Sequence, residues 1–291
     1  MIETANAYAK LNLSLDIVSK MDDGYHYLKT VMQSISLSDE ITVKCVPGSG
    51  VSVETGLSYI PGDERNIAAM AARAFFKHTC IEGFRTHIRI EKKIPVCAGL
   101  GGGSADGACV LRILNNLFGT NLDLKTLEAI GGSIGSDVPF CVAGGTALAE
   151  GRGDILKDLT PISRCYVVVC KPLFSCSTPE LFKKVRCEKI RARPDTDGIV
   201  EALEKHDLRG VAQRTYNVFE DILPRGIRDI ADIKYAMHDN GALGAAMSGS
   251  GPTVFGLFDN ETYAILAFEQ LKTSYEECFI AETVGKAGVD N

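Results

Sequence analysis

The chain has 291 residues, a net charge of −6 and a pI near 5.5, and this length is enough for two domains or one large two-lobed unit. Its acidic balance, with no basic run interleaved with aromatics, argues against nucleic acid or an anionic membrane surface as the main partner. No apolar run approaches membrane-spanning length and the first residues lack a signal-peptide pattern, so we expect a soluble, cytoplasmic protein. A phosphate-bearing small molecule is compatible with the charge, because backbone dipoles alone can hold phosphate.

Ten cysteines are present, and none forms a C-x-x-C pair. Several stand among apolar neighbours, as in residues 165–170, and the five histidines lie far apart. We therefore expect most thiols to be buried in a reducing environment, and we assign no metal ligands.

Residues 7–17 alternate apolar and polar side chains, which is typical of a strand. Lys10 and Asn12 share one face of it, either as part of an ordinary solvated face or as neighbours in a site. The turn at 22–24 is followed at once by an aromatic cluster, Tyr-His-Tyr at 25–27. That cluster either fills a core or offers a platform on which a flat ligand stacks.

The next segments predict two strands, at 30–37 and 41–46, around a turn at 38–40. A helical pattern then begins at 65–67, and residues 86–90 alternate like a further strand. The chain thus opens with an antiparallel β section.

Residues 95–108, PVCAGLGGGSADGA, join the strand at 86–90 to an apolar helical pattern. Ser104 stands where a helix N-cap is wanted, and Asp106 falls in the predicted first turn. Glycines let backbone N–H groups approach a ligand, and a helix N-terminus favours an anion, so the stretch predicts a phosphate site. The alternative is a flexible turn that only joins strand and helix.

Two familiar phosphate motifs do not fit this stretch. No lysine follows the glycines, which excludes a Walker loop. Ser104 replaces the third glycine of a dinucleotide fingerprint, so that motif is weak as well. A phosphate loop of another type is therefore expected.

A short helix is predicted at 124–130, and Asp137 follows it, two residues before Pro139. Asp137 is either a helix-capping residue or a buried carboxylate that faces the phosphate loop and orients or deprotonates a substrate hydroxyl.

The polar composition of residues 151–157 predicts a domain boundary, giving domains of 1–155 and 156–291. Strands and helices alternate in the second half, which indicates an α+β layer, and its glycine-rich loop at 248–251 is expected to face the same cleft as the first. The elements expected there are strands at 165–170 and 278–284 and on either side of 248–251, a helix starting with Thr178 as its cap, an exposed connection at 186–197, and helices at 199–205, 208–213, 225–240 and 261–275.

Three separated stretches, containing Lys10, residues 95–108 and residues 241–258, resemble the three motifs of the galactokinase, homoserine kinase, mevalonate kinase and phosphomevalonate kinase superfamily, the GHMP kinases. Within it, AYAKLNLSLDI, DGYHYL, GSDVPF and STPELF resemble the 4-diphosphocytidyl-2-C-methyl-D-erythritol kinases, in order and over nearly the whole chain. The resemblance implies a two-domain α+β fold with its active site in the cleft between domains. It also implies transfer of a phosphoryl group from ATP, with Mg²⁺, to the substrate's 2-hydroxyl in the non-mevalonate route to isoprenoid precursors.

The same resemblance implies residue roles. Asp137 would be the catalytic base, and Lys10 would lie beside it and stabilise its ionised form and the developing charge. Tyr25 and Phe182 would sandwich the cytosine while His26 bonds its edge. The remaining contacts would come from Asn12 and Thr178 to the methylerythritol side, from Asn66 and Lys93 near the nucleotide, and from the loop residues Pro95, Val96, Cys97, Ala98, Gly99, Leu100, Gly101, Gly102, Gly103, Ser104, Ala105 and Asp106 to the ATP phosphates.

The partners implied are ATP and a small cytidine diphosphate substrate, with no nucleic acid and no membrane, for a monomer or weak homodimer. Two alternatives stay open: another GHMP kinase, such as a mevalonate or homoserine kinase, and a catalytically inactive nucleotide-binding protein on the same fold. The aromatic residues favour a cytosine-bearing substrate, which argues against a mevalonate or homoserine kinase. The presence of both Lys10 and Asp137 argues against an inactive nucleotide-binding protein.

The chain departs from the family pattern at two places. Cys97 and Ala98 occupy loop positions where the family often has small or glycine residues, and Gly107 follows Asp106 where alanine is usual. Glycine there should weaken the first helical turn by about 1 kcal/mol relative to alanine.

Overall fold

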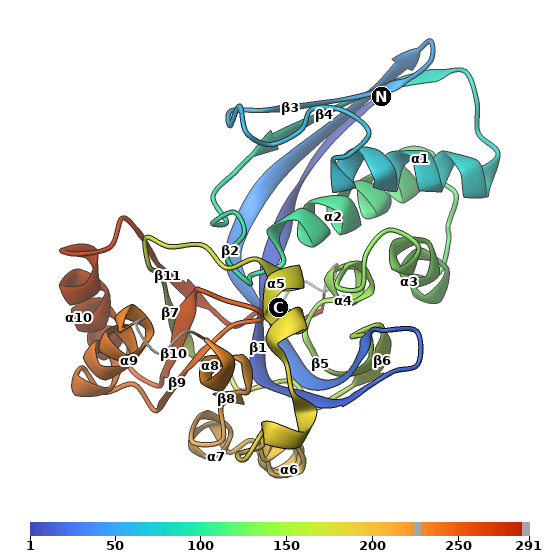
Figure 1. Cartoon of the computed structure of the whole chain (residues 1–291). Helices are drawn as coiled ribbons and strands as arrows, with labels where there is room; N and C mark the ends of the chain where they lie inside the picture. The colour runs from blue at the N-terminus through green and yellow to red at the C-terminus, as the bar shows by residue number, and fades with distance from the viewer. Residues whose placement is uncertain (224–227, 287–291) are drawn as a thin grey trace. The chain divides into compact units, whose positions relative to one another are not determined.

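The computed structural model describes residues 1–223 and 228–286 (Figure 1). The chain divides into two compact units. Unit 1 contains Met1–Ala9, Ser38–Val96 and Gly101–Gly144, and unit 2 contains Lys10–Leu37, Cys97–Leu100 and the chain from Gly145 onward. Each unit is described by itself.

The residue boundaries of these compact units differ from those of the predicted domains, 1–155 and 156–291. The long strands β1 (Ile2–Lys20) and β2 (His26–Pro47) each contribute one part to each unit. The polar stretch expected to be a boundary instead joins β5 (Thr146–Gly151) to β6 (Ile155–Asp158) in an antiparallel hairpin of unit 2. Hairpin turns and linkers share a polar, glycine-containing composition, which explains the difference. The two sequence domains remain a prediction.

In unit 1, β4 (Phe84–Glu91) pairs with the last part of β2 and, on its other edge, with β3 (Val51–Thr55). The helices α1 (Ile67–Thr79) and α2 (Gly102–Leu117) lie side by side, and α1 also packs on β3 and β4 (Figure 1). Two shorter helices, α3 (Leu124–Gly132) and α4 (Val138–Ala143), complete the unit against α2. Alternating burial along β4 confirms the predicted strand, with its apolar side chains turned inward.

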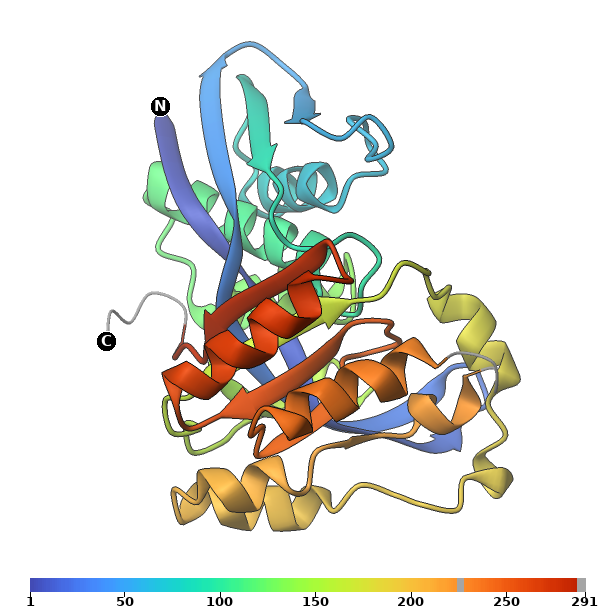
Figure 2. The same cartoon turned by 90° about the vertical axis from the view of Figure 1, so that its left-hand side faces the viewer.

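Unit 2 contains a four-stranded antiparallel sheet in the order β11-β7-β10-β9. The helices α9 (Asp229–Asp239) and α10 (Glu261–Lys272) pack on this sheet (Figure 2). Apolar residues of the strands and both helices form one core cluster. The strands are β7 (Tyr166–Lys171), β9 (Gly244–Met247), β10 (Val254–Phe258) and β11 (Glu277–Glu282).

The other elements of unit 2 are short. They are α5 (Thr178–Lys184), the 3₁₀ helix η1 (Cys187–Lys189), α6 (Thr196–Glu204), α7 (Leu208–Ala212), β8 (Tyr216–Asn217) and α8 (Phe219–Ile222). Within this unit the first part of β2 pairs with β5, and β8 pairs in parallel with β1 at residues 14–15.

The predicted turn at 38–40 is wrong, because β2 is one continuous strand through those residues. The sequence Ser-Asp-Glu has turn chemistry, but Asp39 is fully buried and its carboxylate bonds to backbone N–H groups of another segment.

Two predicted helix starts are also wrong. The N-cap of α2 is Gly101, in a left-handed conformation, so Ser104 lies inside the first turn and Asp106 beyond it. Ser177 precedes α5, so Thr178 is its first helical residue and not its cap. The helix predicted at 225–240 corresponds to α9, while residues 225–227 lie outside the described part of the chain.

The mixture of helices with mostly antiparallel strands confirms the α+β prediction. Six of the ten cysteines are buried, as expected from their apolar surroundings. Within residues 1–223 and 228–286, no helix has the length and apolar character needed to cross a membrane.

Candidate active site

The start of α2 in unit 1 offers backbone donors for an anion. Ala105 N–H already donates to the Gly101 carbonyl, whereas the N–H groups at 102–104 precede the first residue that can bond within the helix. Because α2 is sixteen residues long, its dipole also favours a negative charge at this end. The predicted strand, glycine loop and helix are therefore confirmed as local structure, and their ligand stays a prediction.

The middle of the loop, Cys97–Leu100, belongs to unit 2 and is held there by three hydrogen bonds. Ser248 Oγ donates to the Gly99 carbonyl at 2.9 Å, and the Thr253 and Lys10 N–H groups donate to the Ala98 and Leu100 carbonyls at 3.3 and 3.0 Å. A side chain at Gly99 would place Cβ only 2.1 Å from the Ser248 carbonyl oxygen, and φ there is +78°. The second glycine loop thus contacts the first, while the cleft that both loops are expected to face stays a prediction.

Asn217 holds the second glycine loop from inside unit 2. Its Nδ2 donates to the Met247 and Gly249 carbonyls at 2.7 and 2.8 Å, and its Oδ1 accepts from Phe219 N–H at 3.0 Å. The side chain is fully buried. Sequence reasoning missed this residue, because it ends the two-residue strand β8, shortly before the four-residue helix α8, and belongs to no recognised motif.

Lys10 and Asn12 lie side by side on β1, as the alternation predicted. Lys10 Nζ donates to Asn12 Oδ1 at 2.7 Å, and Asn12 Nδ2 donates to Thr30 Oγ1 at 2.8 Å. Both residues are buried, with 4% and 1% exposure, so the alternative of a solvated face is wrong. A buried ammonium oriented by an amide is an arrangement suited to a developing negative charge.

Asp137 stands at the N-cap position of α4 in unit 1, but its side chain makes no capping hydrogen bond. The capping interpretation is therefore wrong for its carboxylate, which is partly exposed. Helix α4 is fixed by other contacts: Arg112 Nη1 donates to the Cys141 carbonyl at 2.7 Å, and Gly131 leaves room for Val138. Lys10 belongs to unit 2, so its position beside Asp137 stays a prediction.

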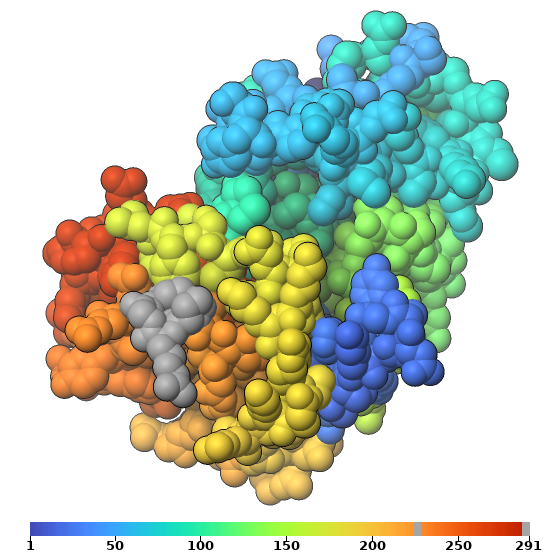
Figure 3. Space-filling model, in the orientation of Figure 1, coloured from blue at the N-terminus to red at the C-terminus, as the bar shows by residue number. Residues whose placement is uncertain are grey.

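The residues predicted to hold a cytosine lie in unit 2. His26 stacks on Phe182 with ring centroids 5.2 Å apart and planes inclined by 30°, and Phe182 meets Phe219 edge-on at 5.0 Å. The segment that contains α5 lies against the tip between β1 and β2 in the space-filling view (Figure 3). Burial lowers the pKa of His26, assisted by the charge of Lys20, which favours a neutral imidazole at pH 7.

Tyr25 is arranged differently from its predicted partner. The Arg152 guanidinium stacks over one face of the Tyr25 ring, 4.0 Å from the ring centroid, in a cation–π contact. Arg152 also forms an ion pair with Asp23. Among the described residues, Tyr25 and Phe182 make no ring contact with each other, so a base held between them stays a prediction. Thr178 Oγ1 lies 2.5 Å from Ser250 Oγ, which brings the start of α5 to the second glycine loop.

The two residues predicted near the nucleotide, Asn66 and Lys93, both lie in unit 1 and differ in their surroundings. Asn66 caps α1, with its Oδ1 accepting from Ala68 N–H at 2.9 Å. The Lys93 side chain is exposed, while its neighbour Lys92 is buried and paired with Asp39 and Asp106. The structure thus distinguishes two lysines that the sequence places together.

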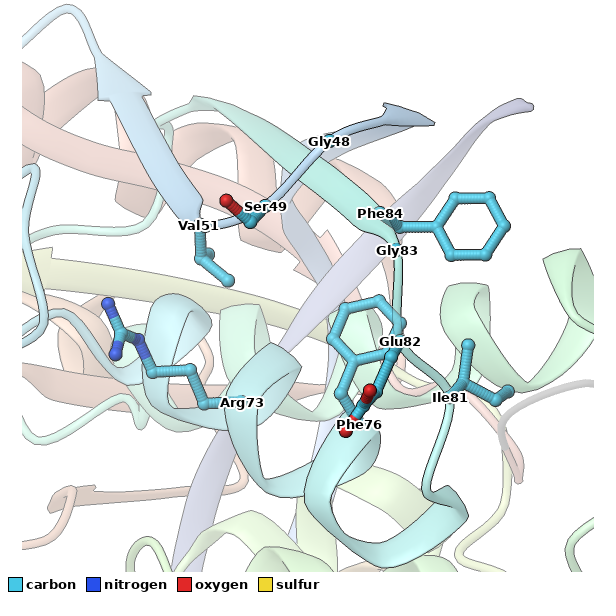
Figure 4. A pocket seen from close by; sticks show the side chains of 10 residues that line it. Gly48, Ser49, Val51, Arg73, Phe76, Ile81, Glu82, Gly83 and Phe84 are labelled. Carbon is cyan, nitrogen blue, oxygen red and sulfur yellow. The ribbon is translucent and has the colours of Figure 1, made fainter.

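A cavity of about 470 Å³ lies elsewhere in unit 1, between the turn at 48–51, the helix α1 and the segment 81–84 (Figure 4). Arg73 and Phe76 of α1 point toward it from one side. None of the predicted site residues lines it, and Arg73 is engaged in an ion pair with Glu64. This cavity is therefore not part of the predicted site.

Comparison with known proteins identifies the family. The family "GHMP kinases N terminal domain" matches residues 66–145, and "GHMP kinases C terminal" matches residues 199–277. The 4-diphosphocytidyl-2-C-methyl-D-erythritol kinase of Clostridium botulinum (strain Eklund 17B / Type B) is 42% identical over 278 residues, which cover 96% of this chain and 99% of that protein. The enzyme of that name from Acetivibrio thermocellus is also 42% identical, over 96% of this chain and 98% of its own.

Comparison with solved structures also finds GHMP kinases. A crystal structure of 4-(cytidine 5'-diphospho)-2C-methyl-D-erythritol kinase matches with a TM-score of 0.83 at 32% identity, covering 97% of this chain and all of that one. Homoserine kinase from Cytophaga hutchinsonii, at a TM-score of 0.75 and 19% identity over 98% of this chain and 95% of its own, shows the shared fold alone.

These matches place the chain among the GHMP kinases, phosphotransferases that act on small molecules with ATP as the donor. Within that class it belongs to the 4-diphosphocytidyl-2-C-methyl-D-erythritol kinase family.

Proposed function

We propose that this protein transfers the γ-phosphoryl group of ATP to the 2-hydroxyl of 4-diphosphocytidyl-2-C-methyl-D-erythritol, giving the 2-phosphate and ADP in the non-mevalonate route to isoprenoid precursors. The observation that carries this proposal is identity of about 42%, over 96% of the chain, to proteins that bear this name. Family members that share only the fold, such as the homoserine kinase, are far less similar in sequence.

The chemistry assigns one task to each group. Asp137 accepts the proton of the substrate hydroxyl as its oxygen forms a bond to the γ-phosphorus, and the bond from that phosphorus to the bridging oxygen of ADP breaks. Lys10, oriented by Asn12, offsets the negative charge that develops around the transferred group. The N–H groups at the start of α2 bind the phosphates, and alignment with charge stabilisation supplies most of the acceleration.

Mg²⁺ fits this site as an ion held mainly by phosphate oxygens and water. Across the described residues, no group of three or more His, Cys, Asp or Glu side chains is arranged to hold a metal by itself. Mg²⁺ keeps several waters and commonly binds through substrate phosphates, so such a cage is not required. When bound, it neutralises charge on the β- and γ-phosphate oxygens.

The substrate subsite draws on the aromatic groups of unit 2. Phe182, fixed by its edge contact with Phe219, offers a face for the cytosine, and the neutral imidazole of His26 can bond to the base edge. Thr178 and Asn12 supply polar groups for the rest of the substrate.

The test is ADP release by the purified protein with Mg²⁺-ATP, comparing 4-diphosphocytidyl-2-C-methylerythritol with mevalonate and homoserine. Turnover with the first substrate alone is expected. Turnover only with mevalonate or homoserine would overturn the substrate assignment, and no turnover with any of them, despite measurable ATP binding, would identify an inactive nucleotide-binding protein.

The role of Asp137 is tested by Asp137→Ala, which should abolish turnover while ATP still binds. Asp123→Ala is a matched control, because Asp123 is an exposed acid that caps α3 through Thr126 N–H and lies outside the proposed machinery. Near-normal turnover by Asp137→Ala would remove it as the base.

A further inference from the structure

Unit 1 contains a buried cluster of two acids and one lysine, Asp39, Lys92 and Asp106. Lys92 Nζ donates to Asp106 Oδ2 at 2.9 Å and also to Asp39 Oδ2. The exposed fractions of the three side chains are 6%, 0% and 6% for Lys92, Asp39 and Asp106. Ionic groups this deeply buried require close partners, and each finds one in the cluster.

Asp39 also fixes the backbone that enters the glycine loop. Its Oδ1 accepts from Lys93 N–H at 2.5 Å and from Ile94 N–H at 2.8 Å, one residue before Pro95. One carboxylate in the middle of β2 thus binds a side chain and two consecutive N–H groups of the incoming segment. Charge-assisted bonds of this kind are stronger than neutral ones and hold the backbone in one geometry.

The lysine extends this attachment to the segment that leaves the loop. Asp106 lies in α2, one turn after the helix begins. A Cβ added to Gly102 would lie 3.3 Å from Lys92 Nζ and 3.1 Å from Ile94 Cγ2, so the ammonium sits directly against the first turn of α2. Lys92 therefore connects the entry to the loop, the exit from it and β2.

Stability alone does not account for such a cluster. Buried ion pairs are often no more stabilising than well-packed apolar side chains of similar volume. Here two carboxylates share one lysine, and among the described residues Asp106 Oδ1 has no hydrogen-bond partner. Burial raises the pKa of Asp106 to about 7 although Lys92 opposes the rise, so the arrangement costs folding energy.

We propose that Lys92 is a positioning residue for ATP, which acts through Asp39 and Asp106 to hold the two ends of the glycine loop so that the first N–H groups of α2 face the nucleotide phosphates. This inference rests on the proposed function, since it takes ATP as the ligand of the loop. Lys92 itself does not contact the nucleotide, because both carboxylates occupy its ammonium. Its neighbour Lys93, exposed at the surface, is the lysine available to a ligand.

The first test compares Asp106→Asn with Asp106→Leu. The asparagine oxygen can still accept from Lys92 Nζ, whereas the leucine side chain offers no acceptor. We expect Asp106→Asn to bind Mg²⁺-ATP within about threefold of the wild type and Asp106→Leu to bind it about tenfold or more weakly, because small displacements of positioning groups are costly. Binding is measured by titration calorimetry with Mg²⁺-ATP alone, so the result does not depend on turnover.

The second test is Lys92→Met in steady-state kinetics. The KM for ATP should rise by about tenfold or more, with the KM for the cytidine substrate within about twofold of the wild type. Asn115→Ala is the control, because Asn115 holds the far end of α2 through Thr120 and Leu122 and its loss should lower thermal stability without changing either KM.

The outcomes separate the two proposals. Equal ATP affinity in the wild type and Asp106→Leu, or an equal rise of both KM values in Lys92→Met, overturns the positioning role. If Lys92→Met does not fold, as judged by circular dichroism, the Asp106 pair of variants decides. Failure of the wild type to turn over the cytidine substrate refutes the proposed function instead, while ATP binding still reports on the loop.

Discussion

Substitution of Asn217 by alanine tests how the second glycine loop is held. The side chain makes three hydrogen bonds to backbone groups in a site with no exposure to solvent. Alanine removes all three partners at once, and a net hydrogen bond contributes about 1 kcal/mol, with more lost when a buried group stays unsatisfied. We expect a loss of about 3 to 4 kcal/mol in the free energy of unfolding.

The assay is urea unfolding followed by far-ultraviolet circular dichroism, with Asn240→Ala as the matched control. Asn240 Nδ2 also makes two hydrogen bonds, to the Ala236 carbonyl and to Gln270 Oε1, but it lies partly exposed at the end of α9. Water replaces its lost partners, so its substitution should cost below about 1 kcal/mol. A cost for Asn217→Ala no larger than that of the control would refute the reasoning.

Three further predictions follow from local geometry. Gly107→Ala should destabilise by about 1 to 2 kcal/mol in the same assay despite a better helix propensity, because the added Cβ would lie 2.8 Å from Ile67 Cγ2; a stabilised variant would contradict this. The pKa of Asp106 is near 7 when folded, against 3.8 ordinarily, so its contribution to stability is complete below about pH 4 and is lost as pH rises through 7. Asp106→Asn should flatten that part of the stability profile, and an unchanged slope would reject the assignment. Phe182→Ala should raise the KM for the cytidine substrate about tenfold with the KM for ATP unchanged, since stacking a base contributes about 1–3 kcal/mol; an unchanged substrate KM would reject the stacking role.

Local patterns predicted those parts of the site that depend on a single segment. The two-residue period of β1 placed Lys10 and Asn12 on one face, and the glycines at 95–108 predicted a strand, loop and helix, both as the structure has them. The pattern did not show that both faces of β1 are covered, because an alternating strand looks the same whether its polar face meets water or another layer. The burial of Lys10 therefore could not be predicted from the sequence.

Long-range contacts set the remaining geometry. Asp39 and Lys92 are 53 residues apart and Lys92 and Asp106 are 14 apart, and no periodicity links them. The local chemistry of Asp39 even misleads, since an acid between Ser38 and Glu40 is typical of a turn. Its carboxylate is instead inside a continuous strand, because the incoming loop segment supplies N–H donors that compensate its burial.

Gly107 shows how propensity and packing give opposite readings of one residue. As an isolated helix position, glycine costs about 1 kcal/mol relative to alanine and predicts a weak turn. Because α2 begins at Gly102, that turn is the second one and not the first one, which the sequence predicted. In the fold this glycine lies against α1, where a Cβ would meet both a side-chain methyl and the backbone oxygen of Ile67. Close approach of α1 and α2 thus offsets the local cost, and the helix that supplies the phosphate-facing N–H groups is held by its neighbour and by the Asp39–Lys92–Asp106 cluster rather than by its own first turn.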